Sequence, residues 1–142
     1  RLDTLQAAIL LVKLKYLDEW TERRRANADI YRELLGGLEQ VIAPDDPEDA
    51  RAVYHTFVVQ AERRSELKDY LKDKGVGTNI HYPVPIHMAR AAADLGYEPG
   101  QFPVTERQAK LILSLPVYPE MEIKELEFVV ENIRDFYGTA GK

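Results

Sequence analysis

The first part of the chain carries apolar residues at the spacing of one helix face. Leu5, Ile9 and Val12 begin this stripe, and the same repeat of three or four residues continues as far as Leu34. A polar stretch over 21–27 interrupts the stripe and makes a kink there the alternative. The pattern predicts one long helix from residue 3 to about residue 35.

Residues at both ends of this segment are suited to begin and end a helix. Asp3 can cap the N-terminus, with Gln6 three residues later, and Gly36 and Gly37 end the pattern. At 1.5 Å per residue the helix would be roughly 50 Å long, which exceeds the diameter of a compact domain of this size. One end should therefore project toward another domain or subunit.

The remainder of the chain alternates short extended and helical patterns. The extended segments are 53–60, 76–82 and 114–117, and the helical segments are 65–74, 87–95, 104–113 and 123–137. This order predicts a two-layer α+β domain with a strand–helix–strand unit, which is right-handed if its strands are parallel. The sequence does not reveal the pairing direction. We divide the chain into a connecting helix (1–36), an α+β domain (37–138) and a frayed tail (139–142).

Composition narrows the classes of protein that remain. The chain has 142 residues and no cysteine, which excludes disulfides and cysteine-ligated zinc. A net charge of -5 and a pI near 5.3 argue against a nucleic-acid binder. No apolar run approaches the ~18 residues that a membrane span needs, and the N-terminus has no signal-peptide pattern. We therefore expect a cytoplasmic protein that binds neither nucleic acid nor membranes.

The sequence contains no complete set of catalytic or metal-binding residues. The two prolines between His81 and His87 exclude a helical metal pair, so we expect no metal site. No Gly-x-Ser-x-Gly motif is present, and Gly75-Val76-Gly77 follows a helix instead of preceding one. We expect His55 to be a hydrogen-bonded structural histidine, and Arg23–Arg25 to form a solvated, salt-bridged helix face.

The most informative segment is 78–85. In it, His81 and Tyr82 lie at a strand end, immediately before the stiff sequence Pro83-Val84-Pro85. Loops that a scaffold holds rigid often carry binding residues. From the residues alone, a ligand contact and a buried structural role are equally open for this pair.

Several stretches, taken together, carry a family resemblance. They are Arg1–Leu10 (RLDTLQAAIL), Leu17–Trp20 followed by Arg23–Arg25, Val53–His55, Gly77–Pro85 (GTNIHYPVP), Leu95–Tyr97, Phe102–Pro103 with Glu106–Arg107, and Leu113–Pro116. In this order and at this spacing they resemble the DegT–StrS family of nucleotide-sugar aminotransferases, which use pyridoxal phosphate. The resemblance spans nearly the whole chain but only the C-terminal portion of such an enzyme.

The resemblance implies the small domain of a fold-type-I aminotransferase, with a long N-terminal helix and a small mixed sheet covered by helices. In the family the large domain carries the Schiff-base lysine and the aspartate at the pyridinium nitrogen, and neither has a counterpart here. The lysines of this chain fall mostly on polar helix faces, whereas a Schiff-base lysine needs a desolvated pocket. We therefore expect no catalytic, cofactor-binding or metal-binding residue in this chain, which alone should be inactive.

The resemblance implies substrate-binding roles for three residues. Arg1 corresponds to the arginine of the family's Asn-x-Arg motif, which faces the nucleotide-sugar across a dimer interface, and a guanidinium suits a diphosphate. His81 and Tyr82 match the His-Tyr pair that approaches the sugar and its phosphates. Asn79 is a weaker candidate. The first helix would then join the large and small domains.

Two functions from different classes are compatible with these observations. The first is the C-terminal domain of a pyridoxal-phosphate-dependent enzyme of amino-sugar and polysaccharide biosynthesis. It moves an amino group from an amino acid, typically glutamate, to a nucleotide-linked keto-sugar, and works as a cytoplasmic homodimer with a large domain. The second is a non-catalytic α+β binding or dimerisation module, whose apolar first helix is buried in a partner. A nucleic-acid binder is disfavoured, because acidic residues balance the basic cluster.

Overall fold

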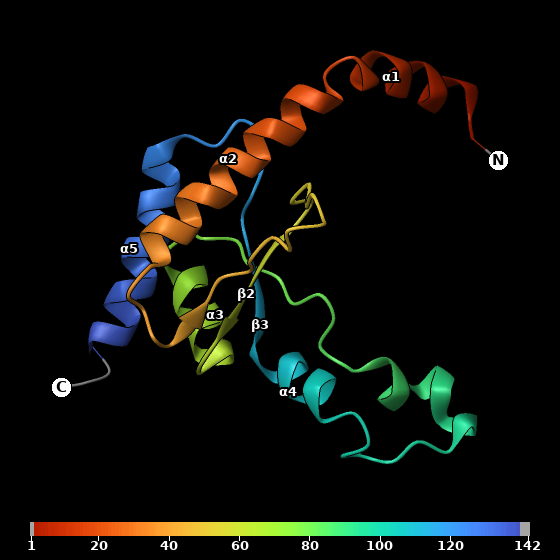
Figure 1. Ribbon diagram of the computed structural model, residues 1–142, viewed down its shortest axis with the longest axis vertical. Coiled ribbons are helices and arrows are strands. Elements are labelled where there is room, and N and C mark those ends of the chain that lie inside the picture. The colour runs from red at the N-terminus through yellow and green to blue at the C-terminus, as the bar shows by residue number, and fades with distance from the viewer. Residues whose placement is uncertain (1, 140–142) are drawn as a thin grey trace.

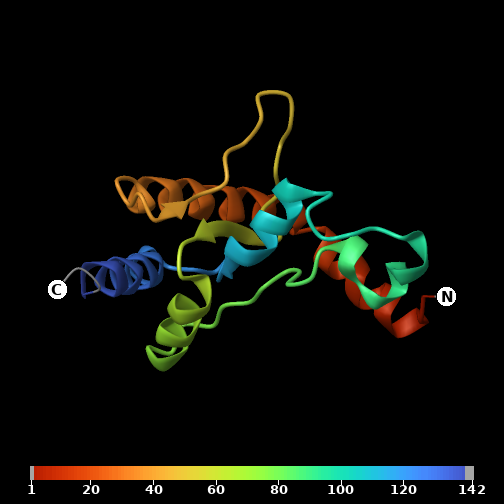
Figure 2. The ribbon, with the colours of Figure 1, turned by 90° about the horizontal axis from the view of Figure 1, so that it is seen from below.

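The structure, a computed structural model, describes residues 2–139 (Figure 1). Its elements in chain order are α1 (Thr4–Leu14), α2 (Leu17–Leu35), β1 (Val41–Ile42), β2 (Phe57–Ala61), α3 (Arg64–Asp73), the 3₁₀ helices η1 (Ile86–Met88) and η2 (Arg90–Leu95), α4 (Pro103–Leu111), β3 (Ile112–Leu115) and α5 (Ile123–Thr139). α2 lies along α5, and α3 packs against α5 and against strands β2 and β3 (Figures 1 and 2). The α+β fold class predicted from the sequence is confirmed.

The predicted long helix is in fact two helices, separated at Lys15 and Tyr16. The chain leaves α1 through a tightened turn, in which the backbone N–H groups of these residues donate to carbonyls three residues earlier (3.3 and 3.0 Å). The Tyr16 ring then stacks on Trp20 in α2, with ring centroids 5.7 Å apart. The polar stretch at 21–27 is continuous helix, so the break lies away from the predicted kink. The prediction of one unbroken helix is wrong.

The two helices differ in how far they join the core. α1 projects away from the sheet and buries none of its residues, so the expected projection is confirmed (Figure 1). Its N-terminus is capped as predicted, because the Asp3 carboxylate accepts from the Leu5 N–H at 2.8 Å. α2 instead buries Tyr31 and Leu35.

Among residues 2–139, no helix is both long enough and apolar enough to cross a membrane. The division of the chain at residue 36 stays a prediction.

The sheet has the order β1-β2-β3 and is antiparallel throughout, where the resemblance implied a mixed sheet. Val59 of β2 pairs with Leu113 of β3. The segment 76–82 adds a single antiparallel bridge, between Asn79 and Ser114 of β3. β2 and this segment therefore run in the same direction on the two sides of β3. The two extended segments of the predicted strand–helix–strand unit are not neighbours in the sheet. β3, which comes later in the chain, lies between them.

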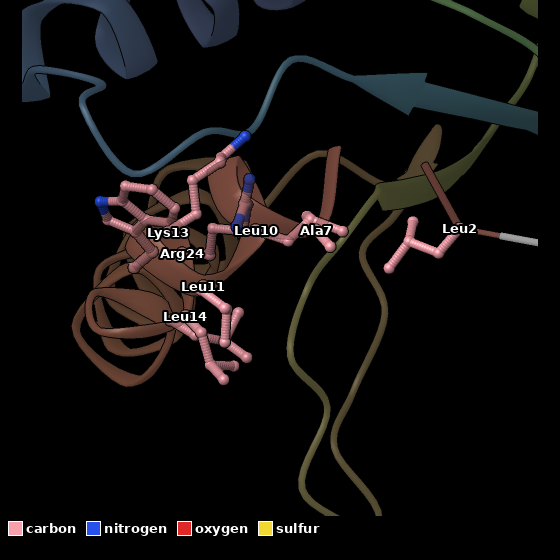
Figure 3. A pocket seen from close by; sticks show the side chains of 9 residues that line it. Leu2, Ala7, Leu10, Leu11, Lys13, Leu14 and Arg24 are labelled. Carbon is pink, nitrogen blue, oxygen red and sulfur yellow. The ribbon is translucent and has the colours of Figure 1, made fainter. Parts of the chain in front are cut away.

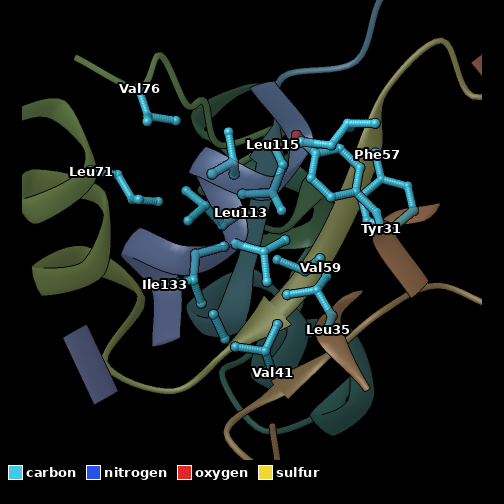
Figure 4. Close-up of a cluster of buried hydrophobic side chains, with 14 of the residues drawn as sticks. Tyr31, Leu35, Val41, Phe57, Val59, Leu71, Val76, Leu113, Leu115 and Ile133 are labelled. Carbon is cyan, nitrogen blue, oxygen red and sulfur yellow. The ribbon is translucent and has the colours of Figure 1, made fainter. Parts of the chain in front are cut away.

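Tyr31 and Phe57 lie in the core, where neither residue is exposed to solvent (Figure 4). Their rings stack with centroids 5.0 Å apart. The Tyr31 hydroxyl donates to the backbone carbonyl of Pro116 at 2.9 Å, which joins α2 to the chain that follows β3. Burial raises the pKa of Tyr31 well above its ordinary value, with smaller contributions from Tyr118 and Glu125. The phenol therefore stays protonated, as this hydrogen bond requires.

Residues 86–102 leave the sheet as an excursion that contains both 3₁₀ helices (Figure 1). The His87 ring packs on Phe102, with centroids 4.6 Å apart, and its Nε2 lies 3.1 Å from a carboxylate oxygen of Glu106 in α4. Glu106 also accepts from the backbone N–H groups of Gly100 and Phe102, at 2.8 and 3.2 Å. Partial burial raises the pKa of Glu106, but these hydrogen bonds lower it by more and leave it below its usual value.

Replacing Tyr31 by Phe keeps the stacked ring and leaves the Pro116 carbonyl without its buried donor. We expect the free energy of unfolding, measured by urea denaturation, to fall by about 1–3 kcal/mol. Tyr97→Phe is the matched control, because Tyr97 is 47% exposed. Loss of its hydroxyl should change the free energy of unfolding by less than about 0.5 kcal/mol. Equal effects of the two substitutions would contradict the role of the Tyr31 hydrogen bond.

The Glu106 carboxylate makes stability depend on pH. Because its pKa is lower in the folded than in the unfolded protein, its ionised form stabilises the fold above the unfolded pKa, and this contribution is lost as the pH falls through the folded pKa. As the pH is lowered from about 7 to about 3.5, we expect the free energy of unfolding of Glu106→Gln to fall less than that of the wild type, as measured by urea unfolding. Glu127→Gln, at an exposed position of α5, should keep the wild-type pH dependence. The hypothesis fails if the two variants behave alike.

Candidate functional site

His81 and Tyr82 lie at the end of the segment 76–82 that bridges to β3, just before the prolines that lead into the excursion. A cis peptide bond joins them, and their rings meet edge to face with centroids 6.0 Å apart. Tyr82 is 79% exposed, so it is not buried against the loop prolines. Arg1, the third predicted substrate residue, lies outside the described residues, as do residues 140–142 of the predicted tail. The structure therefore places two of the three predicted side chains together.

The His81 ring is held by hydrogen bonds at both of its nitrogen atoms. Nδ1 lies 2.9 Å from the Ser114 hydroxyl oxygen, and Nε2 lies 2.9 Å from the side-chain nitrogen of Asn79. These two partners are themselves joined by a pair of backbone hydrogen bonds. Asn79 N–H donates to the Ser114 carbonyl at 3.2 Å, and Ser114 N–H donates to the Asn79 carbonyl at 2.7 Å. The histidine is therefore attached to the sheet, although it lies at the start of a loop.

His81 borders two surface hollows. The first has a volume of about 330 Å³, and its polar lining includes His55, Asn79 and Ser114. The second has a volume of about 300 Å³ and lies between Tyr82, the proline loop and α4. Sites that enclose a small molecule typically span ~300–1,000 Å³. Each hollow lies at the lower end of this range, so a ligand as large as a nucleotide-sugar would need a further wall. Within residues 2–139, no group of three His, Asp or Glu side chains could hold a metal ion.

His55 is exposed at the first hollow, so the prediction of a hydrogen-bonded structural histidine is not supported. Strict alternation along the predicted strand would bury His55 together with Phe57 and Val59. β2 begins only at Phe57, however, and Tyr54 has a left-handed backbone with φ 46°. This conformation shifts the alternation, so that Tyr54 is buried and His55 faces solvent. The sequence carries no signal for a tyrosine in this conformation, which is uncommon for bulky residues.

The basic run on α2 is only partly the solvated face that was predicted. Arg23 forms an exposed ion pair within the helix, as expected. Arg25 is partly buried instead and lies 3.3 Å from the Asp46 carboxylate, in the loop that precedes β2. The Tyr54 hydroxyl donates to the same carboxylate. That hydrogen bond and the charges of Arg32 and Arg25 lower the pKa of Asp46, although partial burial opposes them. These contacts hold the loop against α2.

A second, apolar surface lies where α1 meets α2. A hollow of about 640 Å³ is bordered by side chains of both helices, among them Leu10, Leu14 and Trp20 (Figure 3). Exposed apolar side chains occupy most of the circumference of α1, except the side that carries Gln6 and Lys13; they are Leu5, Ile9, Leu10, Leu11, Val12 and Leu14. A helix with so wide an apolar surface is ordinarily buried on several sides. α1 therefore has the composition of a helix that further protein surface covers.

Comparison with known proteins identifies relatives of this chain. A profile of the DegT/DnrJ/EryC1/StrS aminotransferase family matches residues 1–134. The chain is 42% identical over 139 residues to the pleiotropic regulatory protein of Geobacillus stearothermophilus, covering 96% of this chain and 37% of that protein. It is 39% identical over 136 residues to the dTDP-3-amino-3,4,6-trideoxy-alpha-D-glucose transaminase of Streptomyces venezuelae, covering 96% and 36%. The chain thus spans little more than a third of the length of these curated relatives.

Solved structures agree with these relatives. The crystal structure of S. venezuelae DesV in complex with a ketimine intermediate matches with a TM-score of 0.91 at 39% identity, covering 96% of this chain and 37% of that one. A DegT DnrJ EryC1 StrS aminotransferase from Brucella abortus matches with a TM-score of 0.87 at 35% identity, covering 97% and 36%. The matches cover α1 and the excursion as well as the sheet, because nearly the whole chain is aligned. The chain belongs to the DegT/DnrJ/EryC1/StrS aminotransferase family.

Proposed function

We propose that the protein to which this chain belongs is a pyridoxal-phosphate-dependent aminotransferase. It transfers an amino group from an amino acid, with glutamate as the expected donor, to a keto-sugar carried on a nucleotide. Family membership supports the class, and several relatives are nucleotide-sugar aminotransferases by name. The observation in this chain that carries the proposal is the His81–Tyr82 pair, whose histidine is hydrogen-bonded to β3 and which borders two small hollows. That geometry fits one wall of a site whose other wall lies elsewhere.

The described residues do not suit a covalently bound pyridoxal phosphate. Six of the seven lysines among residues 2–139 are exposed, and Lys68 is partly buried on α3. A Schiff-base lysine needs a desolvated pocket that favours its neutral form. We therefore assign the cofactor and its lysine to the part of the relatives' length that this chain does not span. We expect this chain alone to be inactive.

In this proposal, His81 and Tyr82 bind the nucleotide-sugar, and Arg1 contacts its diphosphate across a subunit interface. The imidazole is held by two side chains, so it loses little conformational freedom when a ligand binds. The exposed Tyr82 has a hydroxyl that donates and accepts hydrogen bonds. A guanidinium at Arg1 would supply the paired donors that a diphosphate prefers. The three residues together would orient the sugar for a reaction whose amine lies outside this chain.

The exposed α1 supports a second candidate, a non-catalytic α+β binding or dimerisation module. As a stand-alone module, the chain would bury the apolar surface of α1 against a second copy. The enzyme proposal also accounts for α1, because a large domain and the second subunit of a homodimer would cover it. Cofactor binding by the complete protein distinguishes the two candidates, since a dimerisation module has no use for pyridoxal phosphate.

The complete protein should show the visible absorbance of bound pyridoxal phosphate and should aminate a nucleotide-linked keto-sugar with glutamate. We expect His81→Ala to lower kcat/KM about tenfold, because at least one substrate hydrogen bond is lost, and to leave the absorbance unchanged. Lys72→Ala, at an exposed position of α3, should leave both measurements unchanged. A complete protein without visible absorbance and without transfer activity would favour the dimerisation module.

The apolar surface of α1 gives a second prediction for the complete protein. Leu14 is 61% exposed in this chain, and we expect Leu14→Asp to bury a charge against the covering domain or subunit. The loss should reach about 2–5 kcal/mol of unfolding free energy, or appear as dissociation in size-exclusion chromatography. Ile123→Asp is the matched control, because Ile123 is 59% exposed and lies in the first turn of α5, where an acidic residue is tolerated. If the control is equally harmful, α1 is not a covered surface.

A further inference from the structure

The side-chain amide of Asn79 has only one orientation that satisfies its neighbours. Its oxygen accepts a hydrogen bond from the backbone N–H of Ile80 at 2.8 Å. Its nitrogen must therefore be the atom that faces His81 Nε2 at 2.9 Å. An amide nitrogen carries two hydrogens and accepts nothing, so it can only donate. The hydrogen bond consequently runs from Asn79 to His81, and Nε2 carries a lone pair instead of a hydrogen.

The same reasoning settles the other ring nitrogen. A neutral imidazole has one N–H, and with Nε2 as the acceptor this hydrogen must be on Nδ1. Nδ1 then donates to the Ser114 hydroxyl oxygen, which lies 2.9 Å away. An imidazolium, or a ring with its hydrogen on Nε2, would instead set an N–H against the amide N–H of Asn79. Ser114 does not select between the forms, because a hydroxyl both donates and accepts. Asn79 alone makes the selection.

We propose that Asn79 is a positioning residue that keeps His81 in the neutral Nδ1–H tautomer, and that the Asn79–His81 pair recognises a hydroxyl group of the sugar. The proposal rests on the proposed function and specifies which part of the substrate His81 contacts. A hydroxyl that displaces the direct Asn79–His81 hydrogen bond replaces it with two, because it accepts from the Asn79 amide and donates to His81 Nε2. An ionised phosphate oxygen in the same place only accepts, so it would take the amide donor and leave the Nε2 lone pair unpaired.

The rigidity of the pair supports this role. Asn79 and Ser114 are joined by two backbone hydrogen bonds, and Ser114 is only 6% exposed. The ring is thus fixed by partners that are joined to the sheet, and His81 borders the first hollow together with both partners, Asn79 and Ser114. A donor and an acceptor side by side at the edge of a hollow match the two capacities of one hydroxyl group.

The tautomer is tested by NMR of the complete protein with ¹⁵N-labelled histidine, in which loss of a signal in His81→Gln identifies the ring. We expect the wild-type spectrum at neutral pH to show a neutral ring with its hydrogen on Nδ1. Asn79→Asp should move the hydrogen to Nε2, because a carboxylate accepts where the amide donates. Ser114→Ala should keep the Nδ1–H form, because Asn79 is still present. A wild-type ring that is protonated at Nε2, or an unchanged tautomer in Asn79→Asp, would overturn the proposal.

Recognition of the sugar is tested by calorimetric binding of four probes: thymidine and uridine diphosphate, each with and without glucose. The reference probe is whichever diphosphate-glucose the wild type binds more tightly. Asn79→Asp should weaken binding of this probe about tenfold more than it weakens binding of the corresponding bare diphosphate. The bare diphosphate reports the effect of the added charge. Equal weakening of both would overturn hydroxyl recognition in favour of a phosphate contact. If the wild type binds none of the four probes, the proposed function and hydroxyl recognition both fall, whereas the tautomer is decided by the NMR spectrum alone.

Discussion

Two backbone hydrogen bonds, between Asn79 and Ser114, hold the candidate site in place. They attach the segment 76–82 to β3, which lies between this segment and β2. β3 is in turn fixed by its pairing with β2, and the chain just after it receives the hydroxyl of the buried Tyr31. A series of contacts thus runs from the buried Tyr31 of α2 through the sheet to His81. The position of His81 is therefore fixed through contacts that lead back to the core, although the residue itself is exposed.

Local patterns in the sequence predicted most of the helices, because the apolar face of a helix is a signal within a few residues. α5 and α3 lie within two residues of their predicted ranges for this reason. The break after α1 was missed, since Lys15 and Tyr16 are not helix-breaking residues and the stacking of Tyr16 on Trp20 accompanies it. The prolines after Tyr82 indicated where candidate binding residues lie. Their partner Ser114 is 33 residues from His81, and no local pattern reports a contact at that distance.

Two surfaces of this chain are built for contact and lack a counterpart within the described residues. The hollows beside His81 are too small to enclose a nucleotide-sugar, and α1 exposes apolar side chains over most of its circumference. One surface is polar and ordered by hydrogen bonds, and the other is apolar and continuous along a helix. A larger protein of the family would cover both surfaces with its remaining length, the first as a site and the second as an interface. The proposed function thus gives the two surfaces one common explanation.

The insertion of β3 between β2 and the segment 76–82 also determines the order in which the molecule can assemble. During synthesis His81 leaves the ribosome 33 residues ahead of Ser114, and until β3 arrives the two flanking segments have no strand between them. Closing this long connection costs chain entropy that only the completed sheet repays. The histidine therefore acquires its Ser114 partner only once β3 is in place. A chain in which His81 is held on both sides is, by that fact, a chain in which β3 has joined the sheet.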